Sequence, residues 1–171
     1  MVADTRRRAL IFGISGQAGS YTADLLLSKG YAVAGVIRRT SHGTDNLSRI
    51  RHIIGNIDLI EGDITDSSSI DKALLWHPNE IYNWSAQSQV GTSFIEPLHT
   101  SDVTGLGALR IFEAVRLKTS VSERVKIYHS SSSEMFGGSP APQDETTPFS
   151  PKSPYACAKT FAHYCAQVYR S

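Results

Sequence analysis

The sequence lacks any long hydrophobic run and any excess of charge of one sign. No purely apolar run exceeds four residues, as in Ala9–Phe12, whereas a membrane-spanning helix needs about 20. The three arginines Arg6–Arg8 precede an apolar stretch that ends at Gly13, so this start predicts a first strand and not a signal peptide. Seventeen Lys and Arg residues against sixteen Asp and Glu give a net charge of +1. We therefore expect a protein that binds neither nucleic acid nor a membrane.

Cysteine is scarce, with only Cys157 and Cys165 present. On one helix, their eight-residue separation would place them roughly 12 Å apart, whereas a disulfide needs Cα atoms within about 7 Å of each other. The two thiols are therefore not expected to pair, which fits a reducing cytoplasm. We expect both to behave as small buried hydrophobic side chains.

Strand and helix patterns alternate along the chain. This order predicts an α/β, doubly wound (Rossmann-like) parallel sheet in a single domain, residues 1–171, with ligands beyond the carboxyl ends of the strands. Loops are expected at 38–47 and 137–154. The predicted strands are 8–14, 31–37, 57–62, 80–84 and 125–129, and the predicted helices are 17–28, 67–75, 100–117 and 155–169.

A glycine-rich turn joins the first strand to the first helix. Gly13, Gly16 and Gly19 follow the spacing G-x-x-G-x-x-G, with Gln17 inside the turn. Glycines there allow a tight turn, a close approach of the backbone to a pyrophosphate and close helix–strand packing. The free N–H groups of the helix start then face the phosphates. A glycine cluster by itself also suits any tight strand–helix turn, but this context predicts nucleotide binding.

The end of the second strand carries Arg38 and Arg39 and has no carboxylate before Asp45. An enzyme that uses NAD usually has an acidic residue here for the ribose hydroxyls. A guanidinium instead suits the 2′-phosphate of NADP through paired hydrogen bonds. The pair favours NADP as the cofactor; the alternative is a solvated basic turn.

Polar and small residues also follow the third and fourth strands. Asp63 could accept a hydrogen bond from an adenine amino group, with Ile64 beside it, whereas Asp66 is expected to cap the next helix. Small residues after the fourth strand would let a dinucleotide ribose pass close to the backbone. The further cofactor-binding candidates are Ser85, Ala86 and Gln87.

The most specific pattern combines a serine run after the fifth strand with a Tyr-x-x-x-Lys pair on the last helix. Tyr155 and Lys159 lie four residues apart and so share one helix face. A phenol is a poor base near neutral pH, since its reference pKa is about 10, and a nearby ammonium favours its ionised form. A hydroxyl from the serine run Ser130–Ser133 could orient a substrate, and Glu134 follows the run. Tyr155 and Lys159 are the catalytic candidates that this pattern provides, and no metal site is predicted.

Together these motifs resemble the extended short-chain dehydrogenase/reductase superfamily, and within it the GDP-mannose 4,6-dehydratase family. The similarity runs from about Ala9 to Arg170. Sister sugar-nucleotide enzymes usually differ in the first glycine turn and in the double arginine. The segments that carry the resemblance are 16–21, 38–41, 62–66, 86–90, 133–137 and 146–155.

The resemblance implies a dehydration of GDP-mannose with no net redox change. Tyr155 would take the proton of the sugar 4-hydroxyl while NADP⁺ takes hydride from C4, with Ser132 near O4. Lys159 would hold the nicotinamide ribose. Glu134 would remove the C5 proton and assist the loss of water from C6, to which the hydride returns. The family also implies a homo-oligomer, a dimer or tetramer, in which the arginine loop contacts a neighbouring subunit.

Four positions depart from the family pattern. Ala18 replaces the usual aspartate, Gln89 a histidine, Phe136 a tyrosine and Ser132 a threonine. No catalytic group is lost, because Ser132 keeps the hydroxyl. Family members also continue into further strands and a smaller substrate domain, whereas this sequence stops inside the Tyr155–Lys159 helix. We therefore expect an incomplete NADP-binding domain that is inactive by itself.

Three other interpretations remain open. The chain could belong to another sugar-nucleotide dehydratase, to a related epimerase or reductase of the extended family, or to a non-catalytic NADP-binding fragment. Glu134 favours dehydration, because a simple reductase needs no base at C5. Tyr155, Lys159 and Glu134 together argue against a non-catalytic role.

The arginine pair generates the first prediction. The protein should bind NADP more tightly than NAD when both are titrated by calorimetry. Replacing Arg38 and Arg39 with Ala should weaken NADP binding by about 1.5–3 kcal/mol per lost charged hydrogen bond, and should change NAD binding little. Equal affinity for the two cofactors, or a preference for NAD, would contradict the assignment.

Overall fold

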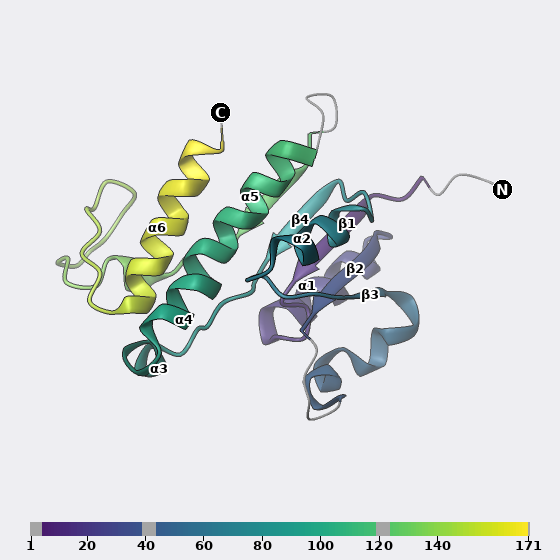
Figure 1. Ribbon diagram of the computed structural model, residues 1–171, viewed down its shortest axis with the longest axis horizontal. Coiled ribbons are helices and arrows are strands. Elements are labelled where there is room, and N and C mark those ends of the chain that lie inside the picture. Colours follow the sequence, from purple (N-terminus) through teal and green to yellow (C-terminus); the bar gives the residue numbers. More distant parts are fainter. Residues whose placement is uncertain (1–4, 39–43, 119–123, 171) are drawn as a thin grey trace.

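A five-stranded parallel sheet forms the centre of the molecule, as the alternating pattern predicts (Figure 1). The computed structural model describes residues 5–38, 44–118 and 124–170. The strand order is β3-β2-β1-β4-β5, with each neighbouring pair parallel. The bounds are β1 Arg8–Phe12, β2 Ala32–Ile37, β3 Asp58–Glu61, β4 Glu80–Asn83 and β5 Lys126–His129.

The register aligns the carboxyl ends of the strands in one row. Phe12 at the end of β1 pairs with Val36 of β2 and Asn83 of β4, and Asn83 in turn pairs with His129 of β5. The order in which the strands are added to the sheet changes side at β1, since β2 lies on one side of it and β4 on the other. Ligands bind at this switch point in open parallel sheets.

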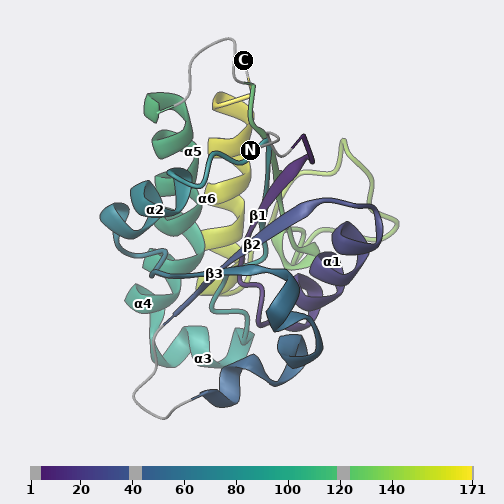
Figure 2. The ribbon, with the colours of Figure 1, turned by 90° about the vertical axis from the view of Figure 1, so that its right-hand side faces the viewer.

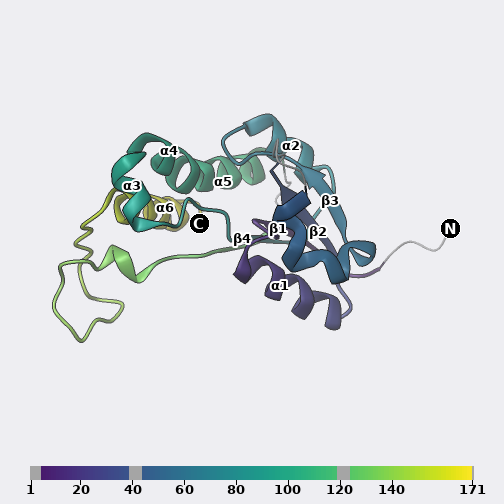
Figure 3. The ribbon, with the colours of Figure 1, turned by 90° about the horizontal axis from the view of Figure 1, so that it is seen from below.

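Helices cover both faces of the sheet. Seen from below in Figure 3, α1 lies on one side, and α2, α4 and α5 lie on the other. None of the helices in the described parts of the chain is long and apolar enough to cross a bilayer. The α-helices are α1 Gln17–Ser28, α2 Ser67–Leu74, α3 Val90–Ile95, α4 Pro97–Ser101, α5 Gly107–Lys118 and α6 Pro154–Val168, and the other helical segments are η1 Thr44–Asn56, η2 Asp102–Leu106 and η3 Ser133–Met135.

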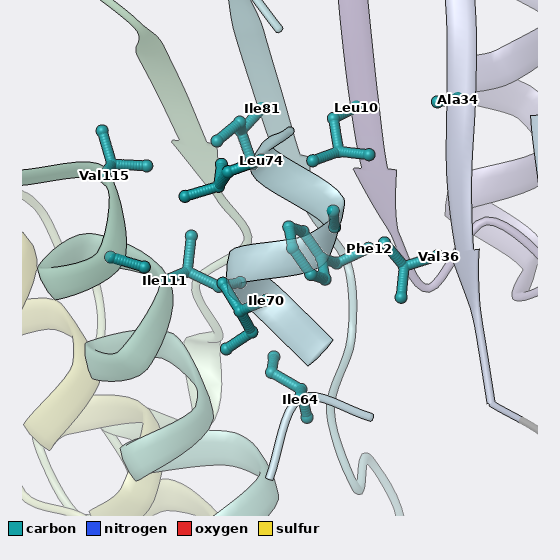
Figure 4. Close-up of a cluster of buried hydrophobic side chains, with 12 residues drawn as sticks. Leu10, Phe12, Ala34, Val36, Ile64, Ile70, Leu74, Ile81, Ile111 and Val115 are labelled. Carbon is teal, nitrogen blue, oxygen red and sulfur yellow. The ribbon is translucent and has the colours of Figure 1, made fainter. Parts of the chain in front are cut away.

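Each face of the sheet has its own core, because successive strand residues point to opposite faces. Leu10 and Phe12 of β1 pack with Ile70 of α2 and Ile111 of α5 (Figure 4). On the other face, the alternate β1 residues pack with α1 and η1. That second cluster includes Ala9, Ile11, Ala23, Leu26, Ile50 and Ile53. Nearly every residue of β1 and β2 is buried, as is typical of strands in a parallel sheet with helices on both faces.

The last helix extends the layer formed by α5. Figures 1 and 2 show α6 beside α5 along most of its length. Ala108 and Phe112 of α5 pack with Ala162 of α6, and Tyr169 just after α6 donates a hydrogen bond to Glu113 at 2.7 Å. The catalytic candidates on α6 are therefore fixed through α5 to the sheet.

Asp66 caps α2, as the sequence predicts. Its carboxylate accepts from the backbone N–H of Ser68 at 2.9 Å and of Ser69 at 3.2 Å. A side chain at this position satisfies donors that have no partner within the helix. The Asp66 carboxylate is thereby engaged in the fold, which leaves Asp63 as the carboxylate of this segment that faces the cleft described below.

The sequence prediction missed the helical segment η1. Residues 38–47 were expected to be a loop, yet residues 44–56 form a 3-10 helix. Leu47, Ile50 and Ile53 recur every third residue and contribute to the core below β1 and β2. That spacing matches the three residues per turn of a 3-10 helix and not the 3.6 of an α-helix, so a search for the α-helical period does not detect it.

The helix predicted at 100–117 begins earlier than expected. The helical path runs from Pro97 through the π-helical segment η2 to Lys118, and the short helix α3 precedes it. Pro97 occupies the first turn of α4, where its missing N–H is no loss. Several strands also end one or two residues before the predicted limits; β1 ends at Phe12 because Gly13 turns the chain with φ of 78°.

The expectation that both cysteines are buried was wrong. Cys157 is exposed and Cys165 is partly exposed, and neither forms a disulfide. The buried side of α6 runs through Tyr155, Lys159 and Ala162, at helical spacing. Cys157 lies outside this arc, because it is two residues from Tyr155 and not three or four.

The core generates a stability prediction. Ile70 is fully buried between α2 and the sheet, so Ile70→Ala should lower the free energy of unfolding by about 2–5 kcal/mol. Leu75, which follows α2, is 73% exposed, and Leu75→Ala should change stability by less than about 0.5 kcal/mol. Denaturant unfolding of both variants measures the difference. Equal losses would show that α2 does not pack as described.

Candidate functional site

A cleft of about 730 Å³ opens at the carboxyl ends of β1, β2 and β4. This volume is in the range of ordinary small-molecule sites. Its walls come from the turns that follow the strands and from the helical segment after β4. The lining residues are Phe12, Gly13, Ser15, Gly16, Gln17, Ala18, Gly19, Val36, Arg38, Gly62, Asp63, Ile64, Trp84, Ser85, Ala86, Gln87, Ser88, Gln89, Thr92, His99 and Val103.

The glycine turn forms the floor of the cleft. Gly13 has φ of 78°, and a Cβ there would lie 2.9 Å from the backbone nitrogen of Ser85. The N–H of Gly16 donates to the carbonyl of Gly13 at 3.0 Å, which closes the turn. A Cβ on Gly19 would overlap that same carbonyl oxygen. The turn therefore depends on glycine at its first and last positions, as the sequence predicts.

The start of α1 faces the cleft with its backbone donors available. Gly16 is the N-cap residue, no side chain caps the helix, and the first turn carries no acidic residue. Gly16 and Gln17 are exposed. Free N–H groups and the positive end of the helix dipole attract a phosphate group. This part of the cleft fits the pyrophosphate of a dinucleotide.

Arg38 and Asp63 lie in the cleft wall, where β2 and β3 end. Burial acts to raise the pKa of the Asp63 carboxyl, but hydrogen bonds from Thr65 and the positive charges of Arg38 and His99 outweigh it, so the pKa lies below its usual value. Asp63 Oδ1 accepts from the Thr65 N–H at 2.9 Å and from its hydroxyl at 2.7 Å. Asp63 is therefore an ionised acceptor at neutral pH.

Arg39, the second predicted arginine, lies outside the described residues. Ile64 lines the cleft, but its side chain is largely buried in the core with Ile70 and Ile111. Ile64 can therefore offer a ligand its backbone and a small apolar surface.

The segment after β4 forms the opposite wall, and internal hydrogen bonds fix its shape. Ser85 donates to the side-chain oxygen of Asn83 through its N–H and its hydroxyl. The N–H of Gln87 donates to the Thr104 hydroxyl at 3.1 Å, and its side-chain amide donates to the Thr100 hydroxyl at 3.1 Å. Gln87 thus anchors the wall to α4 and η2, and Ser85 and Ala86 line the cleft beside it.

Ser132 and Glu134 lie at the turn after β5. Ser132 is the N-cap of η3, and its hydroxyl accepts from the N–H of Glu134 at 3.2 Å. Met135 is buried, and η3 packs against α6. The Glu134 side chain is exposed. The turn therefore holds a carboxylate and a hydroxyl beside the helix that carries Tyr155 and Lys159.

Tyr155 and Lys159 are both buried on the same face of α6. Ser153 caps this helix by accepting from the N–H of Ala156 at 3.1 Å. Lys159 Nζ lies 5.8 Å from the centre of the Tyr155 ring and donates to the backbone oxygen of Ser130 at 2.9 Å. Burial lowers the pKa of Lys159 to about 8. The ammonium form therefore predominates at neutral pH, one helical turn from the phenol.

The structure thus separates the predicted residues into two groups. The described cofactor candidates line the cleft, whereas Ser132, Glu134, Tyr155 and Lys159 gather at the end of β5, outside its lining. The end of β4 connects the groups, because Asn83 bonds to Ser85 and its backbone oxygen accepts from the N–H of Ser130. The tyrosine and lysine are therefore one strand away from the cleft.

His99 and Thr92 line the cleft, although the sequence analysis did not select them. They belong to α4 and α3, which were not predicted as helices at those positions. A signal was available, because Pro97 is typical of a first helical turn. Within the described residues, no group of three His, Cys, Asp or Glu side chains could hold a metal ion.

His129, the last residue of β5, was not selected either. Its ring packs edge-on against Phe112 of α5, and its Nδ1 lies 3.1 Å from Asn83 Nδ2. Burial, with the positive charges of Lys159 and then His163 on α6, lowers the pKa of His129 to about 4. The imidazole is therefore neutral at physiological pH.

Comparisons with known proteins agree with this geometry. The family model described as GDP-mannose 4,6 dehydratase matches residues 10–171. The chain is 49% identical to GDP-mannose 4,6 dehydratase 2 of Arabidopsis thaliana and 44% identical to GDP-mannose 4,6-dehydratase of Vibrio cholerae, over 99% and 96% of its own length. It covers 48% and 46% of those proteins, so it spans about half their length.

Solved structures show the same fold. The UDP-glucose 4-epimerase of Brucella ovis, in complex with NAD, is 27% identical with a TM-score of 0.80, over 95% of this chain and 47% of that one. The UDP-glucose 4-epimerase of Thermus thermophilus, also with NAD, is 28% identical with a TM-score of 0.76, over 95% and 52%. The chain has the Rossmann-like fold of these epimerases.

The glycine turn generates a binding prediction. Gly19→Ala should abolish measurable binding of a nicotinamide dinucleotide, because the added methyl group displaces the Gly13 carbonyl that shapes the turn. Gly55→Ala is the matched control, since a Cβ there meets nothing within 4 Å, and it should bind as the unchanged protein does. Cofactor titration, with a thermal melt to confirm folding, tests both. Normal binding by a folded Gly19→Ala protein would exclude this turn as the phosphate site.

His129 generates a pH prediction. Its folded pKa of about 4 lies below the ordinary value of 6.5, so between these values the unfolded chain binds a proton that the folded chain does not. The free energy of unfolding should therefore fall as the pH drops through this window, by up to about 3 kcal/mol. His129→Gln should lose this component. Parallel pH dependences of unfolding for the two proteins would contradict it.

Proposed function

The chain belongs to the GDP-mannose 4,6-dehydratase family, and on this premise we propose that it is the cofactor-binding half of an enzyme that converts GDP-mannose to GDP-4-keto-6-deoxymannose. One structural observation supports the proposal independently of family membership. The segment η3, which carries Ser132 as its N-cap and includes Glu134, packs against α6, which carries Tyr155 and Lys159. A hydroxyl, a carboxylate, a phenol and an ammonium group thus come from two neighbouring elements after β5. These are the groups that such a dehydration requires.

NADP is the proposed cofactor. Gly13, Gly16, Gln17 and Gly19 would hold its pyrophosphate, for which the turn and the open start of α1 leave room. Three further sets of residues would complete its site. Arg38 and Arg39 would bind the 2′-phosphate, Asp63 and Ile64 would contact the adenine, and Ser85, Ala86 and Gln87 would form the wall beside a ribose. When bound, NADP⁺ would accept a hydride from sugar C4 and later return it to C6.

In the first half of the proposed reaction, Tyr155 removes the proton from the sugar 4-hydroxyl. The ammonium of Lys159, 5.8 Å from the ring centre, favours the negative charge that forms on the phenol. Ser132 presents its hydroxyl near O4 and orients the sugar. Because Tyr155 and Lys159 are buried on a capped helix, they meet the substrate in a fixed geometry, which lowers the entropic part of the barrier.

In the second half, Glu134 acts at the neighbouring carbon atoms. The ketone at C4 acidifies the C5 proton, which the Glu134 carboxylate removes. The same group then protonates the C6 hydroxyl as it leaves as water. When the hydride returns to C6, C5 takes up a proton, which balances the one that Tyr155 removed from O4. Glu134 is exposed at the turn, so it can reach a substrate. Proton transfer by one positioned group of this kind contributes about 10²–10⁴ in rate.

Three of the four departures from the family pattern, Ala18, Gln89 and Phe136, fall outside the four proposed catalytic residues. Ala18 and Gln89 line the cleft. Phe136 packs edge-on against Phe149 with ring centres 5.2 Å apart. None of the three contacts Lys159 through a hydrogen bond in the described structure, so they bear on binding more than on the proton transfers. A cytoplasmic homo-oligomer, dimer or tetramer, completes the proposal.

A sugar-nucleotide epimerase is the second candidate, because the structural relatives named above are epimerases. The two candidates differ at Glu134. An epimerase that only oxidises and reduces C4 has no use for a base at C5, whereas a dehydratase needs one. The chemical product of the reaction separates them.

The fifth prediction concerns that product and the role of Glu134. With GDP-mannose and NADP⁺, the full-length enzyme of which this chain would be the cofactor-binding half should form the 4-keto-6-deoxy sugar with no net production of NADPH. Glu134→Gln should still oxidise C4 but stall there, so the absorbance of reduced cofactor should accumulate, and product formation should fall by about 10²–10⁴. The matched Tyr155→Phe protein should give neither product nor reduced cofactor. Epimerised sugar, or full dehydration by the Gln variant, would refute the proposal.

A further inference from the structure

Asn83 and His129 form a side-chain bridge between the ends of β4 and β5. They are register partners and the last residues of their strands. Asn83 Nδ2 lies 3.1 Å from His129 Nδ1, and Asn83 is only 1% exposed. The bridge lies between the cleft wall at Ser85 and the catalytic candidates that follow β5.

The hydrogen bonds of Ser85 fix the direction of this bridge. Asn83 Oδ1 accepts from the backbone N–H of Ser85 at 3.1 Å and from its hydroxyl at 2.6 Å. A backbone N–H can only donate, so the oxygen of the amide must face Ser85 and its NH₂ group must face His129. The imidazole therefore accepts at Nδ1 and carries its proton on Nε2.

The His129 imidazole makes a favourable hydrogen bond through Nδ1, but its other nitrogen lowers the stability of the fold. Nε2 is buried and has no hydrogen-bond partner within the described residues. A buried donor without a partner destabilises a fold by about 1–3 kcal/mol. An apolar ring of similar shape would keep the edge contact with Phe112 without this cost. What the histidine adds is thus the acceptor for Asn83.

The bridge continues directly to Lys159. Asn83 contacts the end of β5 twice, through its side chain to His129 and through its backbone oxygen, which accepts from the Ser130 N–H at 3.2 Å. Ser130 also contacts the lysine, because Lys159 Nζ donates to the Ser130 carbonyl at 2.9 Å and lies 3.4 Å from the Ser130 hydroxyl. The position of Ser130 therefore sets the position of the ammonium group.

We propose that His129 is a positioning residue, which accepts the Asn83 amide at Nδ1 and thereby holds the Ser130 carbonyl where it orients Lys159. The significance of the inference for catalysis rests on the proposed function, in which Lys159 acts beside Tyr155. The neutral ring is essential to it, because a protonated Nδ1 would face the NH₂ group of Asn83 with a second donor. The bridge also ties the catalytic lysine to Ser85 in the cleft wall.

Two substitutions at His129 separate positioning from simple packing. His129→Gln supplies an amide oxygen that can accept from Asn83, whereas His129→Phe keeps a ring of similar shape and removes the acceptor. The readout is the rate of acetylation of Lys159 by acetic anhydride, measured peptide by peptide with mass spectrometry. The exposed Lys29 serves as an internal reference in each protein.

In the unchanged protein, Lys159 should react much more slowly than Lys29, because it is 2% exposed and donates to Ser130. His129→Phe should raise the relative rate at Lys159 several-fold, and His129→Gln should restore the slow rate. Ser85→Ala, which removes the hydroxyl bond to the Asn83 amide oxygen and leaves the backbone N–H bond, should act in the same direction by a smaller factor. This variant keeps the test available if the Phe protein does not fold.

An unchanged rate at Lys159 in a folded His129→Phe protein would overturn the proposal. An equal rise in the Gln and Phe proteins would overturn it too, because the acceptor would then not matter. Acetylation reports the position of Lys159 without any turnover. A failure of this test therefore leaves the proposed dehydration standing, and a failure of the dehydration leaves the positioning result intact.

Discussion

The close approach of two backbone segments, the turn after β1 and the turn after β4, is the constraint on which the rest of the site depends. A Cβ on Gly13 would lie 2.9 Å from the Ser85 nitrogen, so the two turns leave no room for a side chain at this position. The approach directs α1 at the cleft and brings Ser85 to its wall. It also places Asn83 where it can contact β5. A side chain larger than hydrogen at Gly13 would push the two turns apart and displace α1, Ser85 and Asn83.

The groups proposed for phosphate binding and for proton transfer both lie at the carboxyl ends of the strands. Phosphate binding needs backbone donors and a helix start without a carboxylate, and α1 provides both. Proton transfer needs ionisable groups held away from water, and the burial of Tyr155 and Lys159 on α6 provides this. Burial disfavours the charged form of Lys159, whereas the phosphate-binding start of α1 is open to solvent. The two groups of residues lie at the ends of different strands. Hydrogen bonds from Ser130 to Asn83 and from Lys159 to Ser130 connect them.

Prediction from the sequence succeeded where one local rule decides a structure. Gly13 and Gly19 follow a strand and precede a helix, and only glycine fits such a turn. Asp66 caps α2 because it precedes serines at the right spacing. Prediction failed where the partner of a residue is distant. The 3-10 helix at 44–56 forms because Ile50 and Ile53 pack in the cluster with Ala23 and Leu26 of α1. Cys157 is exposed because α5 covers only one side of α6.

The sequence by itself determined the alternation of strands and helices, the glycine turn, and the pairing of Tyr155 with Lys159 on one helix face, because each depends on residues within a few positions of one another. Only the tertiary structure decided that His99 lines the cleft, that His129 accepts from Asn83, and that Lys159 contacts Ser130, 29 residues away. These contacts join residues from different elements. Strand register and helix packing set them, and neither is encoded in any single stretch of chain.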